Sequence, residues 1–315
     1  MTASVRSVSH VAYLGPPGTF TEEALLTQPD LAAAKHKLCR SIPEVLESAA
    51  EGQVDLGFTA IENSIEGTVN VALDALIFEH DLLIQREVVI DVRLHLLGLA
   101  GASLETIQRV ISFPVATAQC RRYLTDNLPH AEEVAANSTA AAARDLSISK
   151  NAESAAIGTI LSQHIYGLEL LATDIEDHPE NQTRFVAVSS SGVPAPTGHD
   201  KTSIVVFQRA DRSGSLMGIL AEFAARSINL TKLESRPTKK ALGDYCFLID
   251  LEGHVADQLV ADCLTSIVAK HGEVKFLGSY PTNIRGNEEQ SNAATTAWSE
   301  AQSWIDDLRG QVDPT

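Results

Sequence analysis

Hydrophobic residues in the first 190 positions fall into short β-like runs separated by stretches with helical spacing. The runs that predict strands are 11–15, 55–61, 86–98, 109–112, 133–136, 155–158 and 184–189. Helices are predicted after most of them, among them one over about 67–79. The T-x-x-E spacing of Thr19 with Glu22 is typical of a capping box at a helix start. Alternating strands and helices favour an α/β fold built on parallel strands.

A second pattern occupies residues 201–283, where strand-like runs surround two amphipathic stretches. The strand-like runs are 202–208, 228–235, 244–251 and 274–280, and the helical stretches are 216–224 and 255–271. Hydrophobic residues recur at i, i+3 or i+4 in both helical stretches, which is the stripe of a helix packed on one face. The resulting order βαββαβ predicts a ferredoxin-like unit.

A segment rich in serine, glycine and proline, SSSGVPAPTGHD, separates the two patterns, and we interpret it as a linker. We therefore expect an α/β domain over 1–190, a linker over 191–200, a ferredoxin-like domain over 201–283 and a polar tail over 284–315. The tail is predicted to carry a short helix that ends near Gly310. One hydrophobic face of that helix would be made by Trp298, Ala301, Trp304 and Leu308.

The composition excludes several classes of function. The 315 residues hold 24 Lys+Arg against 41 Asp+Glu, a formal net charge of −17, so the chain as a whole repels nucleic-acid phosphates. No apolar stretch reaches the roughly 18 residues that a membrane helix needs, and the start lacks the apolar run of a secretory signal. Four scattered cysteines lack zinc-site spacing. We therefore expect a cytoplasmic protein with reduced thiols and no nucleic-acid or membrane partner.

Polar residues follow four of the predicted strands, at the positions where the next helix begins. The segments are GPPGTFTEEA at 15–24, AIENSIEGTVN at 60–70, ISFPVATAQC at 111–120 and ANSTAA at 136–141. Open α/β sheets bind ligands at the carboxyl ends of their strands, and helix starts present free N–H groups to anions. Ordinary turn-and-cap chemistry explains each segment taken singly. Four such segments in one α/β unit suggest a shared cleft.

A fifth polar segment, ENQTRFVAV at 180–188, includes the start of the last strand of the first domain. Arg184 can form paired hydrogen bonds to a carboxylate, and Thr183 offers a hydroxyl on a side chain with few rotamers. A loop with a surface arginine explains the same residues equally well. No GxSxG, HExxH, Walker or dinucleotide-binding motif occurs, and the ten histidines form no ligand cluster.

Together these segments resemble the prephenate dehydratase family, which converts prephenate to phenylpyruvate in phenylalanine synthesis. The similarity covers about residues 10–283 and includes SGSLMGIL and LESRP, which resemble the family's ACT regulatory domain. The resemblance implies a catalytic domain with two α/β lobes around a cleft, like type 2 periplasmic binding proteins. Strands 86–98 and 184–189 would then cross between the lobes. A monofunctional enzyme is expected, because no chorismate mutase helical domain precedes these segments.

The resemblance also assigns roles to individual residues. The catalytic set is Thr183, Glu62, Asn63, Ser112 and Gln119. The substrate-binding set is Thr19, Ser64, Asn137, Ser138, Arg184 and Phe185. The set that would bind L-phenylalanine as an effector is Ser213, Gly214, Ser215, Leu216, Glu234, Ser235, Arg236 and Pro237. No cofactor or metal is implied, and a homodimer or homotetramer is expected because ACT domains commonly pair.

Two positions depart from the family's pattern. Phe113 stands where the family often has a histidine, which changes the polar contacts expected beside Ser112. Ser215 stands where the effector segment often has alanine, so the affinity for the effector or its identity can differ. Two other functions also fit the sequence. Arogenate dehydratase acts on the analogue with an amine in place of the keto group, and a non-catalytic amino-acid sensor would combine the same two domains.

Overall fold

The computed structural model describes residues 8–208, 212–240, 243–282 and 288–311. The chain divides into two compact units. Unit 1 comprises Met1–His80 and Val88–Ser190, and unit 2 comprises Asp81–Glu87 and Ser191–Thr315. A short segment of the expected first domain, Asp81–Glu87, therefore belongs to unit 2.

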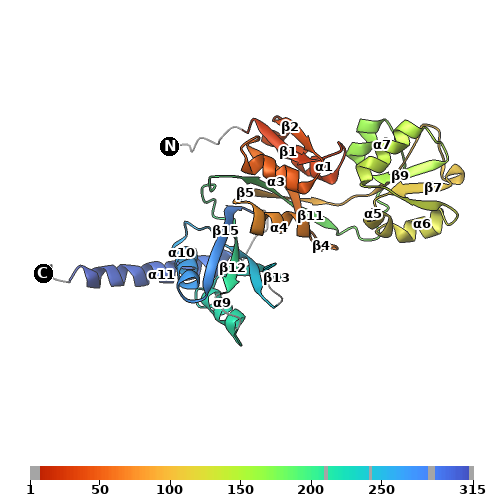
Figure 1. The fold of residues 1–315 in the computed structure, drawn as a ribbon. Helices are drawn as coiled ribbons and strands as arrows, with labels where there is room; N and C mark the ends of the chain where they lie inside the picture. The colour runs from red at the N-terminus through yellow and green to blue at the C-terminus, as the bar shows by residue number, and fades with distance from the viewer. Residues whose placement is uncertain (1–7, 209–211, 241–242, 283–287, 312–315) are drawn as a thin grey trace. The chain divides into compact units, whose positions relative to one another are not determined.

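Unit 1 contains two mixed sheets, which we call the first lobe and the second lobe (Figure 1). The first lobe has the strand order β2-β1-β3-β11-β5, with β4 paired to β3. Its strands are β1 (His10–Leu14), β2 (Lys35–Cys39), β3 (Leu56–Asn63), β4 (Gly67–Thr68), β5 (Leu83–Asp91) and β11 (Gln182–Ser189). The second lobe has the order β10-β6-β9-β7-β8. Its strands are β6 (His95–Gly98), β7 (Arg109–Ser112), β8 (Glu132–Ala135), β9 (Ser154–Gly158) and β10 (Glu169–Ala172).

The helices of unit 1 connect these strands, and several begin at a capping side chain. They are α1 (Phe20–Leu26), α2 (Pro29–Ala32), α3 (Ile42–Ala50), α4 (Asn70–Asp74), a π-helical turn (Ala75–Glu79), a 3-10 turn (Leu104–Thr106), α5 (Pro114–Ala118), α6 (Arg121–Asn127), α7 (Thr139–Ser149) and α8 (Ile160–Tyr166). A hydroxyl accepts an N–H bond at the start of four of them, from Thr19, Ser41, Ser138 and Thr159. Such caps satisfy N–H groups that have no partner inside the helix.

The prediction of a parallel sheet is correct for only part of unit 1. Strand β1 pairs in parallel with β2 and β3, and β7 pairs in parallel with β8 and β9. The pairs β11–β3, β6–β9 and β10–β6 are antiparallel. Parallel pairs need a crossover within one lobe, whereas β6 and β11 each enter their sheet from the other lobe and are free of that constraint.

Both predicted crossings between the lobes need correction. The predicted strand 86–98 is two strands, β5 and β6, which lie in different sheets and are separated by residues 92–94. The second crossing is 173–181, because β10 lies in the second lobe and β11 lies wholly in the first. The predicted helix over 67–79 begins only at Asn70, since β4 pairs with the end of β3. An alternating pattern indicates extended chain but does not indicate the sheet that it joins.

Each lobe has its own hydrophobic core. In the first lobe Phe58 and Phe185 are fully buried, with parallel rings whose centroids are 5.7 Å apart. In the second lobe Leu94, Leu96 and Ile157 belong to one buried cluster. Two separately packed cores allow the lobes to act as distinct bodies joined by short segments.

Unit 2 contains a four-stranded antiparallel sheet with the order β13-β14-β12-β15. Its elements follow the predicted βαββαβ order along the chain: β12 (Asp200–Gln208), α9 (Ser215–Ala224), β13 (Leu230–Pro237), β14 (Tyr245–Glu252), α10 (Gln258–Lys270) and β15 (Gly272–Pro281). Residues of both helices and of the central strands share one hydrophobic core. A terminal helix, α11 (Glu288–Arg309), is longer than the short one predicted, and its Trp304 is exposed.

A buried ion pair explains why Asp81–Glu87 belongs to unit 2. Lys201 Nζ on β12 lies 2.9 Å from Glu87 Oε2, and both side chains are almost fully buried. The hydroxyl of Thr282 also donates to the Glu87 carboxylate. A buried charge requires such partners, so the start of β5 is fixed to the second unit.

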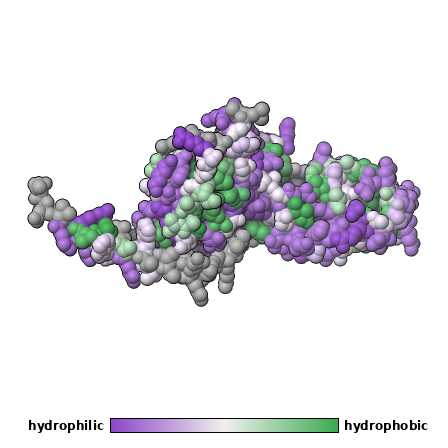
Figure 2. Space-filling view, turned by 90° about the horizontal axis from the view of Figure 1, so that it is seen from below, coloured by the Kyte–Doolittle hydropathy of each residue, from purple (hydrophilic) through white to green (hydrophobic). Residues whose placement is uncertain are grey.

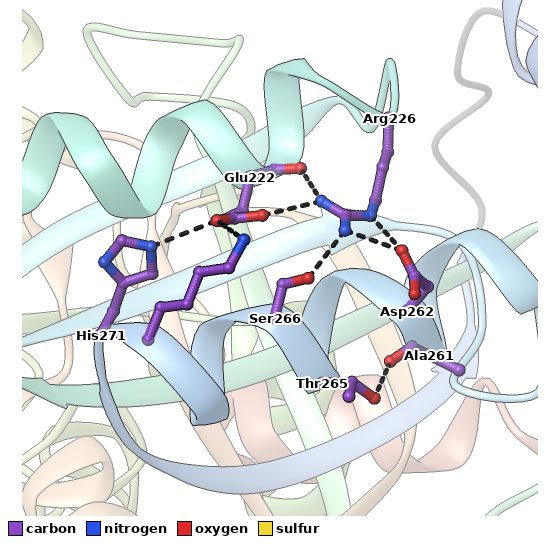
Figure 3. A network of polar contacts seen from close by, with 8 residues as sticks. Glu222, Arg226, Ala261, Asp262, Thr265, Ser266 and His271 are labelled. Atoms are coloured by element: carbon purple, nitrogen blue, oxygen red, sulfur yellow. Dashed lines mark hydrogen bonds and ion pairs between the residues drawn. The ribbon is translucent and has the colours of Figure 1, made fainter.

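The helices of unit 2 are joined by a network of charged groups (Figure 3). Arg226, just beyond α9, lies 2.7 Å from Asp262 Oδ2 and 2.9 Å from Glu222 Oε2. Glu222 also accepts from Lys270 at 3.0 Å. The hydrogen bonds from Arg226, followed by those from Lys270, lower the pKa of Glu222 to about 2.

Hydrophilic side chains cover much of the face in Figure 2, with smaller hydrophobic patches between them. Such patches are ordinary on folded proteins, whose surfaces are largely apolar by area. Among the described residues, no helix combines the length and the apolar character needed to span a bilayer.

Candidate functional site

The antiparallel register of β11 and β3 brings the predicted catalytic residues together. Thr183 lies opposite Asn63, and Arg184 lies opposite Glu62. Asn63 Nδ2 donates to Thr183 Oγ1 at 2.9 Å, and Arg184 lies 3.4 Å from Glu62 Oε2. A register shift follows Arg184, and such bulges often redirect side chains beside active sites.

Asn63 ends β3 and also shapes the turn that follows. Its Oδ1 accepts from the backbone N–H groups of Ile65 at 3.0 Å and Glu66 at 2.9 Å. Asparagine favours such turns because its side chain replaces a backbone acceptor. The turn leaves the amide nitrogen of Asn63 directed at Thr183 and fixes the position of Glu66.

The second lobe contributes Gln119, which follows α5. Gln119 Nε2 donates to Glu66 Oε1 at 3.1 Å. Its Oε1 accepts from Asn181 Nδ2 at 3.2 Å. Asn181 Oδ1 in turn accepts from Asn63 Nδ2 at 2.8 Å. One chain of hydrogen bonds therefore connects the two lobes at this site.

Ser64 joins the same cluster. Its hydroxyl donates to Asn181 Oδ1 at 3.2 Å and accepts from the Gln182 backbone N–H at 2.9 Å. We call the residues that make these contacts the Thr183 cluster. They are Glu62, Asn63, Ser64, Glu66, Gln119, Asn181, Thr183 and Arg184.

Sequence reasoning assigned no role to two members of the cluster, Glu66 and Asn181. Asn181 is 1% exposed, although asparagine is usually a surface residue. Its position two residues before Thr183 was a usable signal, since side chains two apart in extended chain point the same way. For Glu66 the sequence offers no comparable signal, because its side chain reaches the site only through the turn after Asn63.

Five predicted site residues lie outside these contacts: Ser112 of the catalytic set, and Thr19, Asn137, Ser138 and Phe185 of the substrate-binding set. Ser112 is fully buried and donates to the Ile157 carbonyl at 2.9 Å, inside the second lobe. Phe185 is 1% exposed and packs in the first-lobe core, so the structure gives it a packing role in place of a ligand contact. Ser138 caps α7 by accepting from the Ala141 backbone N–H at 2.9 Å. Asn137, just before it, is exposed.

The sequence of the loop at Gly18 suggested a ligand close to the backbone. In the structure the close neighbour is Ser162. A Cβ atom on Gly18 would lie 2.8 Å from Ser162 Oγ, and its φ of +89° also favours glycine. The Gly18 carbonyl accepts from the hydroxyls of Thr159 at 2.9 Å and Ser162 at 2.7 Å, both from the second lobe. Close packing between the lobes therefore explains the glycine.

Thr19 caps α1 but forms only half of the predicted capping box. Its Oγ1 accepts from the Glu22 backbone N–H at 3.3 Å. The Glu22 carboxylate accepts instead from the Tyr13 hydroxyl at 2.6 Å and from the Gly18 N–H at 2.5 Å. Burial, together with the bond to Glu22, raises the pKa of Tyr13. Glu22 thus holds the shape of the loop that precedes α1.

The predicted effector residues lie in two places in unit 2. Gly214, with a φ of +88°, precedes α9, and Ser215 Oγ accepts from the Arg212 backbone N–H at 3.1 Å. Arg236 is buried on β13 and donates to Glu234 at 2.7 Å. Strand β13 is an edge of its sheet. The role of these residues in binding an effector stays a prediction.

The Thr183 cluster is rich in neutral amides and hydroxyls beside one arginine and two carboxylates. Such groups bind and orient polar or anionic molecules by directed hydrogen bonds. Across the described ranges, no three His, Cys, Asp or Glu side chains are grouped so that they could hold a metal ion.

Comparison with known proteins identifies the relatives of this chain. Residues 11–192 match the family model described as prephenate dehydratase. A prephenate dehydratase of Mycolicibacterium vanbaalenii is 39% identical over 313 residues, covering 95% of this chain and 98% of the relative. The structure of the Arthrobacter aurescens prephenate dehydratase in complex with L-Phe has a TM-score of 0.86 and 38% identity, covering 96% of this chain and 99% of that one. GqqA, described as a quorum quenching acylase, has a TM-score of 0.79 and 28% identity, covering 87% and 98%.

Proposed function

The chain belongs to the prephenate dehydratase family, and we propose that the Thr183 cluster is where it converts prephenate to phenylpyruvate. Prephenate carries two carboxylates, a keto group and a ring hydroxyl. When the ring carboxylate leaves as carbon dioxide, its bonding electrons enter the ring and expel the hydroxyl, which leaves as water once protonated. The aromatic product provides the driving force. The protein therefore has to hold two anions and assist the departing oxygen.

Thr183 is the proposed hydrogen-bond donor to that oxygen. The observation that carries this assignment is the 2.9 Å bond in which Asn63 Nδ2 donates to Thr183 Oγ1. The threonine oxygen is the acceptor in that bond, so its own hydrogen points elsewhere. A threonine is a very weak acid in water, and its contribution would come from a preorganised hydrogen bond in a site that excludes water.

Arg184 is proposed to bind one of the substrate carboxylates. Its guanidinium is mostly buried and lies 3.4 Å from Glu62 Oε2. A planar guanidinium suits a carboxylate because two parallel N–H bonds can form. The nearby Glu62 carboxylate would orient the guanidinium. With Glu62 as one anionic partner, Arg184 would bind one further anion, the substrate carboxylate. Asn137 and Ser138, at the start of α7, remain candidates for the second carboxylate.

The two lobes give a physical reason for catalysis without a cofactor. The cluster draws Asn63 from the first lobe and Gln119 from the second, and the two crossings connect them. Closure of two lobes on a substrate removes water and strengthens every directed hydrogen bond inside. Positioning of this kind can supply several kcal/mol of barrier reduction.

The serines of this region do not favour acyl transfer. The Ser112 hydroxyl donates to the carbonyl of Ile157, and that of Ser64 donates to the amide of Asn181. A serine nucleophile needs an adjacent base that can take its proton. Amide and carbonyl oxygens are too weakly basic for that task, so the contacts support dehydration over hydrolysis.

Unit 2 is proposed to be an ACT domain that binds L-phenylalanine and regulates the reaction. The βαββαβ order of its elements and the glycine turn before α9 support this role. The relative from Arthrobacter aurescens was solved with L-Phe. We propose a homodimer or homotetramer, because ACT domains commonly pair. We also propose a cytoplasmic location, where the thiols would stay reduced. Binding would alter turnover only if the effector has different affinities for two conformations.

One assay tests the proposed function. Purified protein is incubated with prephenate or with arogenate, each with and without L-phenylalanine, and the aromatic product is measured. Turnover of prephenate to phenylpyruvate that changes with L-phenylalanine is the expected result. Exclusive turnover of arogenate would reassign the substrate. Binding of L-phenylalanine without turnover of either compound would make the chain a sensor and refute the proposal.

A further inference from the structure

Asn181 is a buried residue for which the proposed steps provide no role. Its side-chain oxygen accepts from Asn63 Nδ2 at 2.8 Å, and its amide nitrogen donates to Gln119 Oε1 at 3.2 Å. Its backbone carbonyl accepts from the N–H of Val92 at 2.8 Å. Asn181 therefore contacts the first lobe, the second lobe and the other crossing, while only 1% of it is exposed.

Both ends of this hydrogen-bond chain fix the orientation of every amide in it. At one end Asn63 Oδ1 accepts two backbone N–H bonds, so the Asn63 nitrogen has to face Asn181 and Thr183. At the other end Gln119 turns its nitrogen to the Glu66 carboxyl oxygen, which accepts, and its oxygen to Asn181. Asn181 lies between them, and both ends require the same orientation of its amide.

The direction of these hydrogen bonds determines where the hydrogen of the Thr183 hydroxyl points. Because the Asn63 nitrogen can only donate, the Thr183 oxygen accepts at 2.9 Å and its hydrogen cannot point back. Among the residues that the structure describes, no group accepts a hydrogen bond from the Thr183 hydroxyl. A reversed amide at Asn181 would face Asn63 nitrogen to nitrogen and weaken this arrangement.

We propose that Asn181 is a positioning residue, which sets the direction of the hydrogen bonds between the lobes and so keeps the Thr183 hydrogen available for the leaving oxygen. This inference rests on the proposed function. Asn181 acts through Asn63, so its loss lowers kcat while leaving substrate affinity largely intact. Glu66 is the acceptor that anchors the far end of the same chain.

The test replaces Asn181 by a side chain of the same shape that can only accept. Asn181→Asp keeps the acceptor for Asn63 but opposes the Gln119 oxygen. If Gln119 rotates to donate, its oxygen then faces the Glu66 carboxylate. Adding Glu66→Gln removes that conflict, because an amide can donate to the rotated Gln119. The control is Asn127→Asp, which adds the same charge at an exposed site on α6.

Steady-state kinetics with prephenate gives the readout. We expect N181D to lower kcat about 10-fold or more with KM within about threefold, E66Q alone to lower kcat about threefold, and the double variant to recover about fivefold over N181D. A kcat for N181D within twofold of wild type would overturn the inference. Additive losses in the double variant would also overturn it, since they would show that Asn181 and Glu66 do not act through one chain of hydrogen bonds. If wild type itself does not consume prephenate, the proposed function fails, and this is a separate outcome.

Discussion

The Thr183 cluster in unit 1 and the Arg226 network in unit 2 solve different physical problems. The first joins neutral amides and hydroxyls from both lobes, with Asn181 almost completely buried. The second joins Arg226, just beyond α9, to Glu222 on α9 and Asp262 on α10 (Figure 3). Lys270, which also pairs with Glu222, is well exposed. In the first network each amide has a fixed direction of donation. The second network is held mainly by the attraction between opposite charges.

The difference teaches how each network responds to change. A neutral amide has a donor end and an acceptor end, so reversal of one amide breaks bonds on both sides of it. A guanidinium near several carboxylates has no such ends, because all of its N–H groups donate and the carboxylate oxygens accept. Substitutions in the Thr183 cluster should therefore reduce turnover, and substitutions in the Arg226 network should reduce stability.

The largest effect is expected for Thr183→Ala. Loss of one preorganised donor costs about 100-fold in kcat, equivalent to about 2.7 kcal/mol of barrier. Stability should change little, because the side chain is small. Phenylpyruvate formation by the purified variant measures this. Thr183→Ser, which keeps a hydroxyl, should retain more activity, and Thr125→Ala on an exposed face of α6 should behave like wild type. Near-normal turnover of T183A would remove Thr183 from the mechanism.

The next effect is expected for Arg226→Ala, and it concerns stability. The variant loses the bonds to Asp262, Ser266 and Glu222. Glu222 keeps its bond from Lys270, whereas Asp262 loses its arginine partner. Urea unfolding should show a loss of about 2 kcal/mol, with turnover by the folded protein unchanged.

Arg309→Ala provides the matched control for that measurement. Arg309 pairs with Asp306 at 3.1 Å on α11, and both side chains are mostly exposed. Exposed pairs contribute between zero and about 1 kcal/mol, so this variant should unfold close to wild type. Equal losses in the two variants would contradict the stabilising role assigned to the Arg226 network.

The smallest effect is the dependence of stability on pH through Glu222. The pKa of Glu222 is lowered to about 2, below the ordinary value for glutamate, so its stabilising contribution is present above that ordinary value. The contribution is lost as the pH falls toward 2, when the carboxylate takes up a proton. Glu222→Gln should reduce this slope in unfolding experiments between pH 5 and pH 2. Partial exposure keeps the effect modest, and added salt should weaken it further. An unchanged slope would contradict the assignment.

Local patterns in the sequence predicted most elements because local spacing determines them. The capping role of Thr19 follows from its spacing to Glu22. The amphipathic stripe over 216–224 predicted α9. The strands β2 and β10 were missed, because Lys35–Cys39 and Glu169–Ala172 mix polar and apolar residues without a clear alternation.

The candidate site could be predicted only in part. Motif resemblance identified Asn63, Gln119 and Thr183, which the structure brings into one cluster. It did not identify Asn181, whose importance comes from burial between the lobes, or Glu66, which the turn after Asn63 brings to Gln119. Burial and orientation depend on chain segments far apart in sequence, and a local motif does not contain them.

The sequence by itself determined most of the elements, their order and the family, because hydrophobic periodicity and short polar strings are local properties of the chain. Only the tertiary structure decided where β5 gives way to β6, why Gly18 has no side chain, and which way each amide of the Thr183 cluster points. These features arise mainly from contacts between residues far apart in the sequence, such as Asn63 and Asn181, which are 118 positions apart. The hydrogen-bonding groups of such residues acquire fixed partners only when the folded backbone brings them within about 3 Å.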